Sequence, residues 1–338
     1  MNLLGMNLLG FHPKYLSDDE DMSHKYQSIE IKGLSYEWYQ LQVGSTSKDI
    51  IFWKRGEGFD YLTFEKNILL RLQKEYSSKE FISIFNDYRK FNTPFKYIPA
   101  LPWWGNVLSS NWHKIKDIKN ISNTHQREKL FLSRNRIGKD HRKKFILFLR
   151  QENLIDRGYV SIGWENKFIE NLEETHLLNP ALKGVPFSKP AHKDFNLLEY
   201  YSDVFCEVVT ESGCHPIVHD DPELTRRRTP FGYFDSEKVW RPFMMCVIPM
   251  IITYPNYDDY LKDAGFDMFD DVIDTSFYKI EDLDEKNRII KNNLEVIEND
   301  LTINGRFRDS IWDRLKKNQE HFIDYKNYYK YVWDKING

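Results

Sequence analysis

A serine, a glutamate and a lysine stand together where a helix is expected to begin. Ser236, Glu237 and Lys238 open the segment SEKVWRPFMMC, whose apolar spacing predicts a helix. Ser236, or Asp235 before it, has the side chain of an N-cap. The first turn of a helix presents free backbone N–H groups that favour phosphate, and Lys238 adds a fixed positive charge. The pattern therefore predicts a site for a phosphorylated ligand whose leaving group gains negative charge.

Further candidate ligand-binding residues stand at expected strand ends. Arg134 follows the strand pattern KLFLS, and Glu211 closes the strand pattern DVFCEVVTES. Ligands of open α/β sheets gather at the carboxyl ends of the strands. A guanidinium can bind a diphosphate through two hydrogen bonds, so we expect Arg134 to do this, with Arg136 and Arg142 as near substitutes. Plain structural roles, such as surface ion pairs and solvated strand ends, remain open for all of these residues.

If a group of this phosphorylated ligand is transferred to a hydroxyl group, a base must take the proton of that hydroxyl. The segment GEGFDY follows the strand pattern KDIIFW, which makes Glu57 and Asp60 candidates, with Glu57 preferred. The alternative is that Glu57 is an ordinary loop residue between turn-forming glycines. Trp103 and Trp104 could offer an aromatic platform to a sugar acceptor or fill a seam between domains.

Metal ligation is not expected. The acidic runs His219-Asp220-Asp221 and Asp258-Asp259 lack a clear Asp-x-Asp pattern. In CHPIVHDD, Pro216 disrupts the spacing that zinc ligands on a helix need. The run of three arginines at 226–228 is a solvated loop or screens the charge of a ligand.

An alternating series of β-rich and amphipathic segments must position these residues. From residue 131 onward the series reads KLFLS, HRKKFILFLRQENL, GYVSIGW, a polar helical stretch, DVFCEVVTES, the helix SEKVWRPFMMC, the buried strand IPMIITY, the helix NYDDYLKDAG and a short strand FDMF. Such alternation predicts an α/β protein with a parallel, doubly wound sheet.

The N-terminal part predicts a second α/β layer. KDIIFW and FKYIPA have strand patterns, and TFEKNILLRLQKEYSS and KEFISIFNDYRKF are expected to be helices. The polar segment NWHKIKDIKNISNTHQREK is the expected linker. We therefore predict an N-terminal α/β domain at 1–125, a C-terminal α/β domain at 126–300, in which the candidate phosphate site lies, and a helical tail at 301–338. The aromatic residues of the tail are expected to pack, bracing one domain against the other.

Size and composition exclude several classes of protein. The 338 residues give room for two domains, because single cores stop growing at about 250–300 residues. A formal net charge of −3 argues against bulk nucleic-acid binding. The three cysteines suit a reducing, cytoplasmic location, and the start MNLLGMNLLG lacks a basic flank and a sustained apolar run. No segment is apolar enough to span a membrane, and Walker, dinucleotide-binding, hydrolase and zinc-protease motifs are absent.

The segment YFDSEKVWRPFMMCVIPMIITYPNYDDYLKDAGFDMF, residues 233–269, resembles the donor-binding half of fucosyltransferases and their viral relatives. It shares the order of a polar cap, Glu-Lys, an aromatic helix, a buried strand and a helix ending in Gly-Phe. SRNRIGKDHR, residues 133–142, resembles the family's Arg-rich turn followed by His-Arg. The resemblance covers residues 129–300 and hardly reaches the N-terminal third.

This resemblance implies a GT-B fold, in which two Rossmann-like domains face each other, here with C-terminal helices packing back across them. It implies an inverting transfer of fucose or another hexose from a nucleotide-diphosphate sugar, GDP-linked sugars included, to a glycan or other hydroxyl acceptor, without a metal or further cofactor. Lys238 and Arg134 would hold the diphosphate, and Glu237 the sugar or ribose hydroxyls. The base, for which Glu57 is our candidate, would lie on the N-terminal domain.

Two other functions fit the same fold. One is a non-catalytic carbohydrate-binding or virion-associated protein that kept the fold without turnover. The other is a DNA-modifying glycosyltransferase, against which the balanced charge argues.

Overall fold

The structure of the protein is a computed structural model. It describes residues 22–31, 34–43, 46–52, 80–85, 96–99, 104, 107–108, 115–135, 140–162, 198–211, 236–253, 255–324, 326–328, 330–331 and 334, the ranges before residue 104 by their backbone. None of the helices in this part of the chain is both long enough and apolar enough to cross a membrane.

The chain divides into two compact units. Unit 1 comprises Met1–Ser110, Pro216–Asp235 and Tyr325–Gly338, and unit 2 comprises Asn111–His215 and Ser236–Asp324. The domain boundaries expected after residues 125 and 300 stay predictions. The expected linker contains the helix α3 (Ile115–Lys119) and belongs to unit 2.

Unit 1 contains a mixed sheet with the strand order β1-β2-β3-β4-β5. Its strands are β1 (Met22–Ile31), β2 (Leu34–Val43), β3 (Thr46–Phe52), β4 (Glu80–Phe85) and β5 (Lys96–Pro99). The first three strands pair antiparallel, whereas β3, β4 and β5 pair parallel. The strands predicted for KDIIFW and FKYIPA are confirmed.

The helix predicted for KEFISIFNDYRKF is wrong at its start, because residues 80–85 form β4. Four of these six residues are phenylalanine or isoleucine, which suit a pleated and half-buried surface better than a helix. The run is also short, and a short apolar run does not distinguish the two structures by its spacing.

Unit 2 is built on a parallel four-stranded sheet with the order β7-β6-β8-β9. Its strands are β6 (Lys129–Asn135), β7 (Gly158–Ile162), β8 (Val204–Thr210) and β9 (Ile248–Ile252). Every residue of β8 and β9 is buried, which explains their near-continuous apolar sequences. The α/β class and the parallel sheet predicted from the alternating segments are confirmed.

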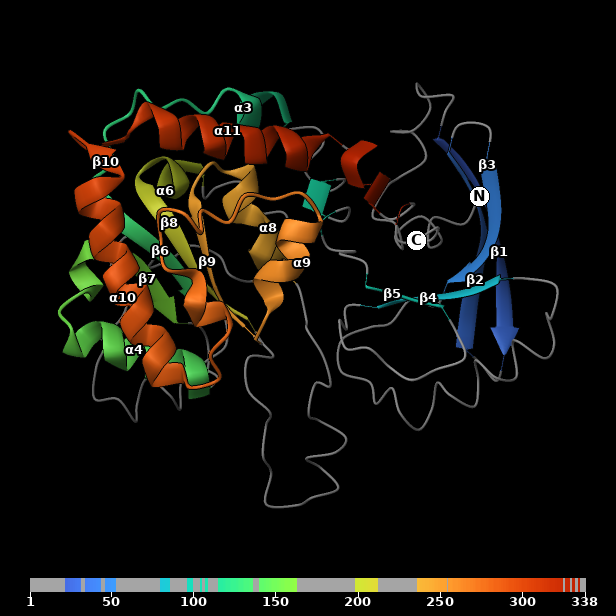
Figure 1. Ribbon diagram of the computed structural model, residues 1–338, viewed down its shortest axis with the longest axis horizontal. Coiled ribbons are helices and arrows are strands. Elements are labelled where there is room, and N and C mark those ends of the chain that lie inside the picture. Colours follow the sequence, from blue (N-terminus) through green and yellow to red (C-terminus); the bar gives the residue numbers. More distant parts are fainter. Residues whose placement is uncertain are drawn as a thin grey trace, which may run out of the picture. The chain divides into compact units, whose positions relative to one another are not determined.

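Helices lie on both sides of this sheet (Figure 1). They are α4 (Asp140–Gln151), α6 (Leu198–Ser202), α8 (Glu237–Met244), α9 (Tyr257–Asp263), α10 (Leu283–Asp300) and α11 (Asp309–Ile323). Figure 1 shows α4 and α10 on one side of the strands and α8 and α9 on the other. The helix α10 packs on β6 and α4, and α11 packs on α8.

The strand order places a switch point between β6 and β8. The chain leaves β6 towards β7 on one side and later returns to β8 on the other side, so the connections diverge there. In open parallel sheets, ligands bind outside the carboxyl ends of the strands at such a point.

The short strand predicted for FDMF is wrong. Residues 266–269 are an irregular segment, and Phe269 has a φ of +62°, which breaks an extended strand. The side chain of Asn318 on α11 takes the place of a neighbouring strand: it accepts from the Asp267 N–H at 2.9 Å and donates to the Asp267 carbonyl at 2.8 Å.

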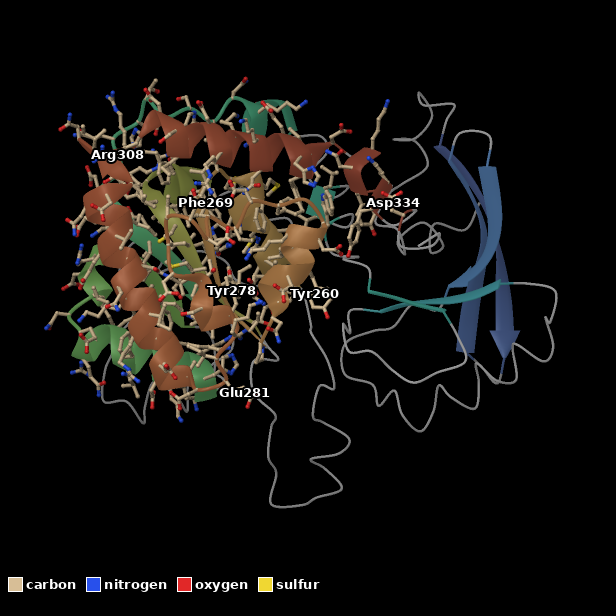
Figure 2. The ribbon with its side chains drawn as sticks, in the orientation of Figure 1. Tyr260, Phe269, Tyr278, Glu281, Arg308 and Asp334 are labelled. Atoms are coloured by element: carbon tan, nitrogen blue, oxygen red, sulfur yellow. The ribbon has the colours of Figure 1, made fainter. Side chains whose placement is uncertain are left out.

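The aromatic residues of the C-terminal segment pack, as predicted. Phe307 and Phe322 are buried, and Phe322 stacks on Trp240 of α8 with 6.1 Å between ring centroids. Figure 2 labels Phe269 and Tyr278, both buried, within unit 2 and Glu281 at its margin. The Tyr278 hydroxyl accepts from the Ile251 N–H at 3.2 Å, which satisfies a donor on the edge strand β9.

Candidate functional site

The carboxyl ends of β6 and β8 are joined by their side chains. The Thr210 hydroxyl at the end of β8 donates to the amide oxygen of Asn135 at the end of β6, and both residues are buried. The next N–H, that of Glu211, donates to the carbonyl of Ile252 at the end of β9 at 2.9 Å. The switch point is therefore a fixed surface on which a ligand can be positioned.

Glu211, Ser236 and Lys238 form a hydrogen-bonded group at this edge, which we term the α8 cap cluster. Ser236 is the N-cap of α8, and its hydroxyl oxygen accepts from the Lys238 N–H at 3.3 Å. The same hydroxyl donates to the Glu211 carboxylate, and the Lys238 ammonium lies 3.4 Å from the hydroxyl oxygen. Three of the predicted site residues are thus brought together from a strand end and a helix start.

The α8 cap cluster combines anion-binding and hydroxyl-binding groups. Glu211 and Ser236 are buried, whereas Lys238 is partly exposed. The start of α8 carries the partial positive charge of the helix dipole, and the Lys238 ammonium adds a full charge beside it. The Glu211 carboxylate is a hydrogen-bond acceptor, and it already accepts from the Ser236 hydroxyl. The arrangement can hold a ligand that carries both phosphate and hydroxyl groups.

Arg142, another predicted contact, pins α4 to the end of β8. Its Nε and Nη2 donate to the carbonyl of Thr210 at 3.2 and 2.9 Å, and the residue is 1% exposed. These bonds place a buried cation beside the carboxyl edge and one residue from Glu211. Arg142 therefore contributes positive potential to the site while two of its donors hold the backbone.

Arg134 lies in a buried network instead of facing the edge. Its Nε and Nη2 lie 3.3 and 3.0 Å from Oε1 of Glu207, a residue in the middle of β8. Nη2 also donates to the Tyr201 hydroxyl of α6, which in turn donates to Oε2 of Glu207 at 2.6 Å. Among the described residues, no contact joins Arg134 to Lys238. Arg134 thus fixes β6, β8 and α6 together.

Tyr201 and Glu207 are members of this network that sequence reasoning missed. Burial raises the pKa of Tyr201 well above its usual value, which keeps the hydroxyl protonated as a donor to Glu207. The signal in the sequence was one acidic residue inside the apolar strand VFCEVVT, since a charge in a buried strand needs a partner. The sequence did not reveal that this partner is Arg134, because Arg134 lies far from Glu207 in the sequence.

Lys286 is a second buried cation near the edge that sequence reasoning missed. It is 2% exposed, and its ammonium donates to the carbonyl of Thr253, just after β9, at 2.6 Å. This bond ties the first turns of α10 to the carboxyl end of β9. The sequence contains little sign that Lys286 is buried, because a lysine near the start of a helix is commonly solvated.

The remaining predicted residues lie outside the described part of the chain. These are Glu57, Asp60, Trp103, Arg136, the run from Cys214 to Asp221, the arginines at 226–228, and the side chain of Glu237, whose backbone opens α8. The roles expected for them stay predictions.

The acidic pair in α9 is engaged by lysines. The carboxylate oxygens of Asp258 lie 3.1 Å from Lys262 and 3.0 Å from Lys279, and Asp259 lies 2.7 Å from Lys279. In the part of the chain that the structure describes, no group of three histidine, cysteine or acidic residues could hold a metal ion.

Two cysteines pack in the core of unit 2. Burial raises the pKa of the Cys206 thiol well above its usual value and that of Cys246 to about 12. Both are therefore inert thiols at neutral pH and take no part in the candidate site.

Comparison of the chain with protein-family models, with curated proteins and with solved structures finds no match.

Proposed function

We propose that the protein is a glycosyltransferase that takes a sugar from a nucleotide-diphosphate donor bound at the switch point of unit 2. The α8 cap cluster carries this proposal: a helix start, an ammonium and a carboxylate meet at the carboxyl edge of a parallel sheet. Such an edge is where nucleotide-bearing ligands of α/β proteins bind. The resemblance of residues 129–300 to fucosyltransferases supports the same assignment.

In this mechanism the diphosphate lies at the start of α8. The charge that builds on the departing nucleotide diphosphate is stabilised by the amide groups of the first turn and by the Lys238 ammonium. Glu211 accepts hydrogen bonds from hydroxyl groups of the ribose or the sugar. A base, for which Glu57 remains the candidate, takes the proton of the acceptor hydroxyl, and direct displacement inverts the anomeric carbon.

The arginines act differently in this mechanism. The contacts of Arg142 support a role in holding the Thr210 carbonyl and adding positive potential near the diphosphate. Those of Arg134 support a positioning role, because its guanidinium lies against Glu207 and Tyr201 beneath the edge. The bidentate diphosphate contact expected of Arg134 would require it to leave that network.

The proposal includes a GT-B arrangement in which unit 1 supplies the acceptor side. In unit 1, the parallel run β3-β4-β5 supports an α/β domain, and its antiparallel β1 and β2 extend the sheet. We propose a hexose as the sugar and a glycan as the acceptor, without a metal.

A binding screen tests the donor site. Thermal unfolding would be followed with GDP-, UDP-, ADP- and dTDP-linked sugars, each with and without a chelator. A donor present at about 100 times its Kd stabilises the protein by about 2.7 kcal/mol, which raises the melting temperature measurably. We expect at least one of the nucleotide sugars to do this, with no effect of the chelator. A melting temperature unchanged by all of them would contradict the proposal.

The Lys238→Ala variant tests the catalytic role. Losing one contact to the charge of the transition state is expected to lower transfer from the donor found in the screen by at least about 100-fold. Lys291→Ala is the matched control, since this lysine of α10 pairs with Glu152, the residue just after α4. Unaltered turnover of folded Lys238→Ala would remove Lys238 from the mechanism.

A further inference from the structure

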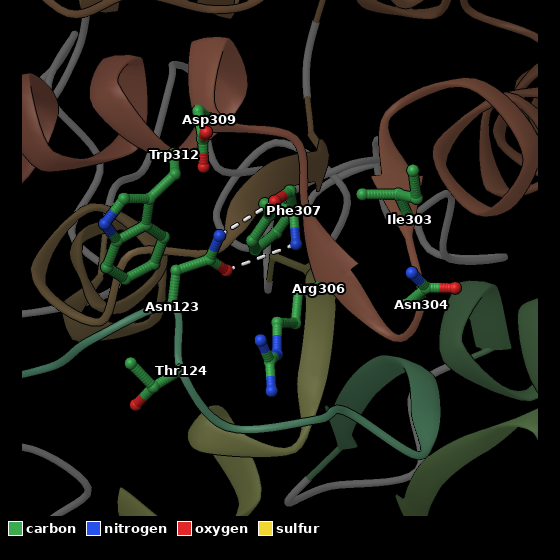
Figure 3. Close-up of a pocket in the computed structure, with 8 residues that line it drawn as sticks. All are labelled: Asn123, Thr124, Ile303, Asn304, Arg306, Phe307, Asp309 and Trp312. Atoms are coloured by element: carbon green, nitrogen blue, oxygen red, sulfur yellow. Dashed lines mark hydrogen bonds between the residues drawn. The ribbon is translucent and has the colours of Figure 1, made fainter.

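A cavity lies at the edge of the same sheet where β6 and β8 begin, in unit 2, and Figure 3 shows the residues that line it. Its volume is about 490 Å³. The residues that line it come from the loop before β6, the hairpin of β10 (Thr302–Ile303) and β11 (Arg306–Phe307), and the start of α11: Asn123, Thr124, Ile303, Asn304, Arg306, Phe307, Asp309 and Trp312. The volume suits a small organic ligand.

The walls of the cavity are fixed without a ligand. The Asn123 amide donates to the Phe307 carbonyl at 2.7 Å and accepts from the Phe307 N–H at 3.2 Å (Figure 3). The Asn304-Gly305 turn of the hairpin has φ values of +50° and +71°, as a two-residue turn requires. The Arg127 N–H holds that turn by donating to the Gly305 carbonyl at 2.8 Å. A ligand would therefore meet a preorganised site.

A buried cation supports the aromatic wall from behind. The Arg127 guanidinium lies 4.7 Å from the ring centre of Phe307 and 5.6 Å from that of Trp312. Burial lowers the pKa of Arg127 to about 10, so the group stays charged at neutral pH. Trp312 is partly exposed, and Ile303 is 55% exposed. The cavity thus offers apolar surface that a ligand could cover.

Two opposite charges line the same cavity without pairing, one on each side of the Asn123–Phe307 pair (Figure 3). Arg306 and Asp309 are both exposed, and among the described residues neither forms an ion pair. A guanidinium only donates hydrogen bonds and a carboxylate only accepts them, whereas Thr124 and Asn304 can do both. The net charge of the lining is zero, and a phosphorylated ligand would meet the repulsion of Asp309. A neutral ligand rich in hydroxyl groups fits this lining best.

We propose that this cavity is a saccharide-binding site. A pyranose ring has an apolar C–H face that can lie against the Trp312 indole, and hydroxyl groups that can accept from Arg306 or donate to Asp309. The seven-residue strand β8 separates this edge from the α8 cap cluster by roughly 20 Å. The site is therefore distinct from the proposed donor site and does not depend on the proposed function.

Saturation-transfer NMR tests the proposal with methyl glycosides of glucose, galactose, mannose, fucose and N-acetylglucosamine. The size of a monosaccharide predicts a Kd in the low millimolar range. Arg306→Ala and Asp309→Ala should each weaken binding at least about tenfold, since each removes charge-assisted hydrogen bonds. Arg308→Ala is the matched control, because Arg308 is exposed in the same segment but does not line the cavity (Figure 2).

Three results would overturn the proposal. The first is the absence of a saturation-transfer signal from all five glycosides at concentrations well above the millimolar range. The second is binding that is unchanged in both Arg306→Ala and Asp309→Ala. The third is binding that Arg308→Ala weakens as much as these two substitutions do. Circular dichroism of each variant confirms that the substitution leaves the fold intact. Lys238→Ala should bind the glycosides normally, so failure of the glycosyltransferase assignment would leave this site standing.

Discussion

At the scale of single residues, Arg134 is a side chain suited to ligand binding that instead forms a buried ion pair within the fold. The residue is 7% exposed, and its partner Glu207 is 2% exposed. Two buried charges lose their hydration, so each depends on the other and on the Tyr201 hydroxyl for compensation. Removing one member leaves the other charge uncompensated in the core.

Arg134→Met is therefore expected to lower the free energy of unfolding by about 3–5 kcal/mol, the usual cost of breaking a buried ion pair. The double variant Arg134→Met with Glu207→Gln should recover part of this loss, because no buried charge remains. Urea unfolding of the two variants without ligand measures both effects. A loss under about 1 kcal/mol in the single variant would favour a ligand contact over the positioning role.

His321 is a residue whose protonation opposes folding. Its Nε2–H donates to the Ala264 carbonyl at 2.7 Å, and its ring packs on Phe266. Burial lowers the pKa of His321 below the ordinary 6.5, although the Ala264 carbonyl and Asp324 act in the opposite direction. The stability linked to the neutral ring is complete above pH 6.5 and is lost as the pH falls through the lowered pKa of the folded state.

We expect the free energy of unfolding to fall less between pH 7.5 and 5.5 in His321→Gln than in the unaltered protein, because an amide can donate to Ala264 but cannot titrate. Urea unfolding at several pH values gives the comparison. His125→Gln serves as the control, since this histidine is exposed. Parallel pH profiles for His321→Gln and the unaltered protein would contradict the expected role.

Residues of the candidate site could be predicted where the local sequence pattern alone places them at the start of a helix or the end of a strand. Ser236 and Lys238 could be placed because a cap residue and an apolar pattern define a helix start, and Glu211 because it ends a strand. The engagement of Arg134 could not be predicted, since it depends on the pairing of β6 with β8 and on a tyrosine from α6. Tertiary partners of this kind are set by the packed structure.

At the scale of elements, the end of α9 depends on one glycine. Gly265 has a φ of +93°, and its N–H donates to the Lys262 carbonyl at 2.9 Å. The next N–H, that of Phe266, donates to the Leu261 carbonyl at 2.9 Å, which completes a Schellman motif. A Cβ at residue 265 would lie 2.9 Å from Nε2 of His321, so both the backbone and the space favour glycine.

Gly265→Ala should therefore lower the free energy of unfolding by about 1–3 kcal/mol, the cost of a strained left-handed residue. In a His321→Ala background the same substitution should cost less, since only the backbone term remains. A double-mutant cycle measured by thermal unfolding separates the two contributions. Equal costs in both backgrounds would show that the ring does not restrict residue 265.

Elements with a strong local pattern were predicted more reliably than short apolar runs. The buried strands β8 and β9 and the capped helix α8 each match one strong local pattern. In contrast, β4 is a short apolar run that suits a helix as well as a strand, and FDMF has the composition of a strand but is held by Asn318. The Asn304-Gly305 turn is a recognised hairpin signal that our interpretation did not use.

At the scale of the whole molecule, unit 1 contains residues from distant parts of the sequence. Trp104 is buried, and its ring lies 5.3 Å from that of Tyr328 and 6.4 Å from that of Tyr331. These tyrosines follow α11, which belongs to unit 2. The chain therefore completes unit 1 only after it has completed unit 2.

Tyr328→Ala is expected to destabilise unit 1 by about 3–5 kcal/mol, the usual cost of deleting a buried aromatic side chain. Hydrogen exchange should then rise in β1 to β5 and stay low in β6 to β9. The matched variant Leu315→Ala removes a buried residue of unit 2 and should give the opposite pattern. Exchange that rises equally in both sheets for both variants would show that the units unfold as one.

The packing of Trp104 on Tyr328 also has a consequence for vectorial synthesis on the ribosome. At the usual rate of elongation, roughly 10 to 45 s pass between the addition of the indole and that of its tyrosine partner. During that interval the nascent polypeptide carries a large apolar ring that its final partner does not yet cover. The region around Trp104 is thus where we expect a chaperone to engage the growing chain.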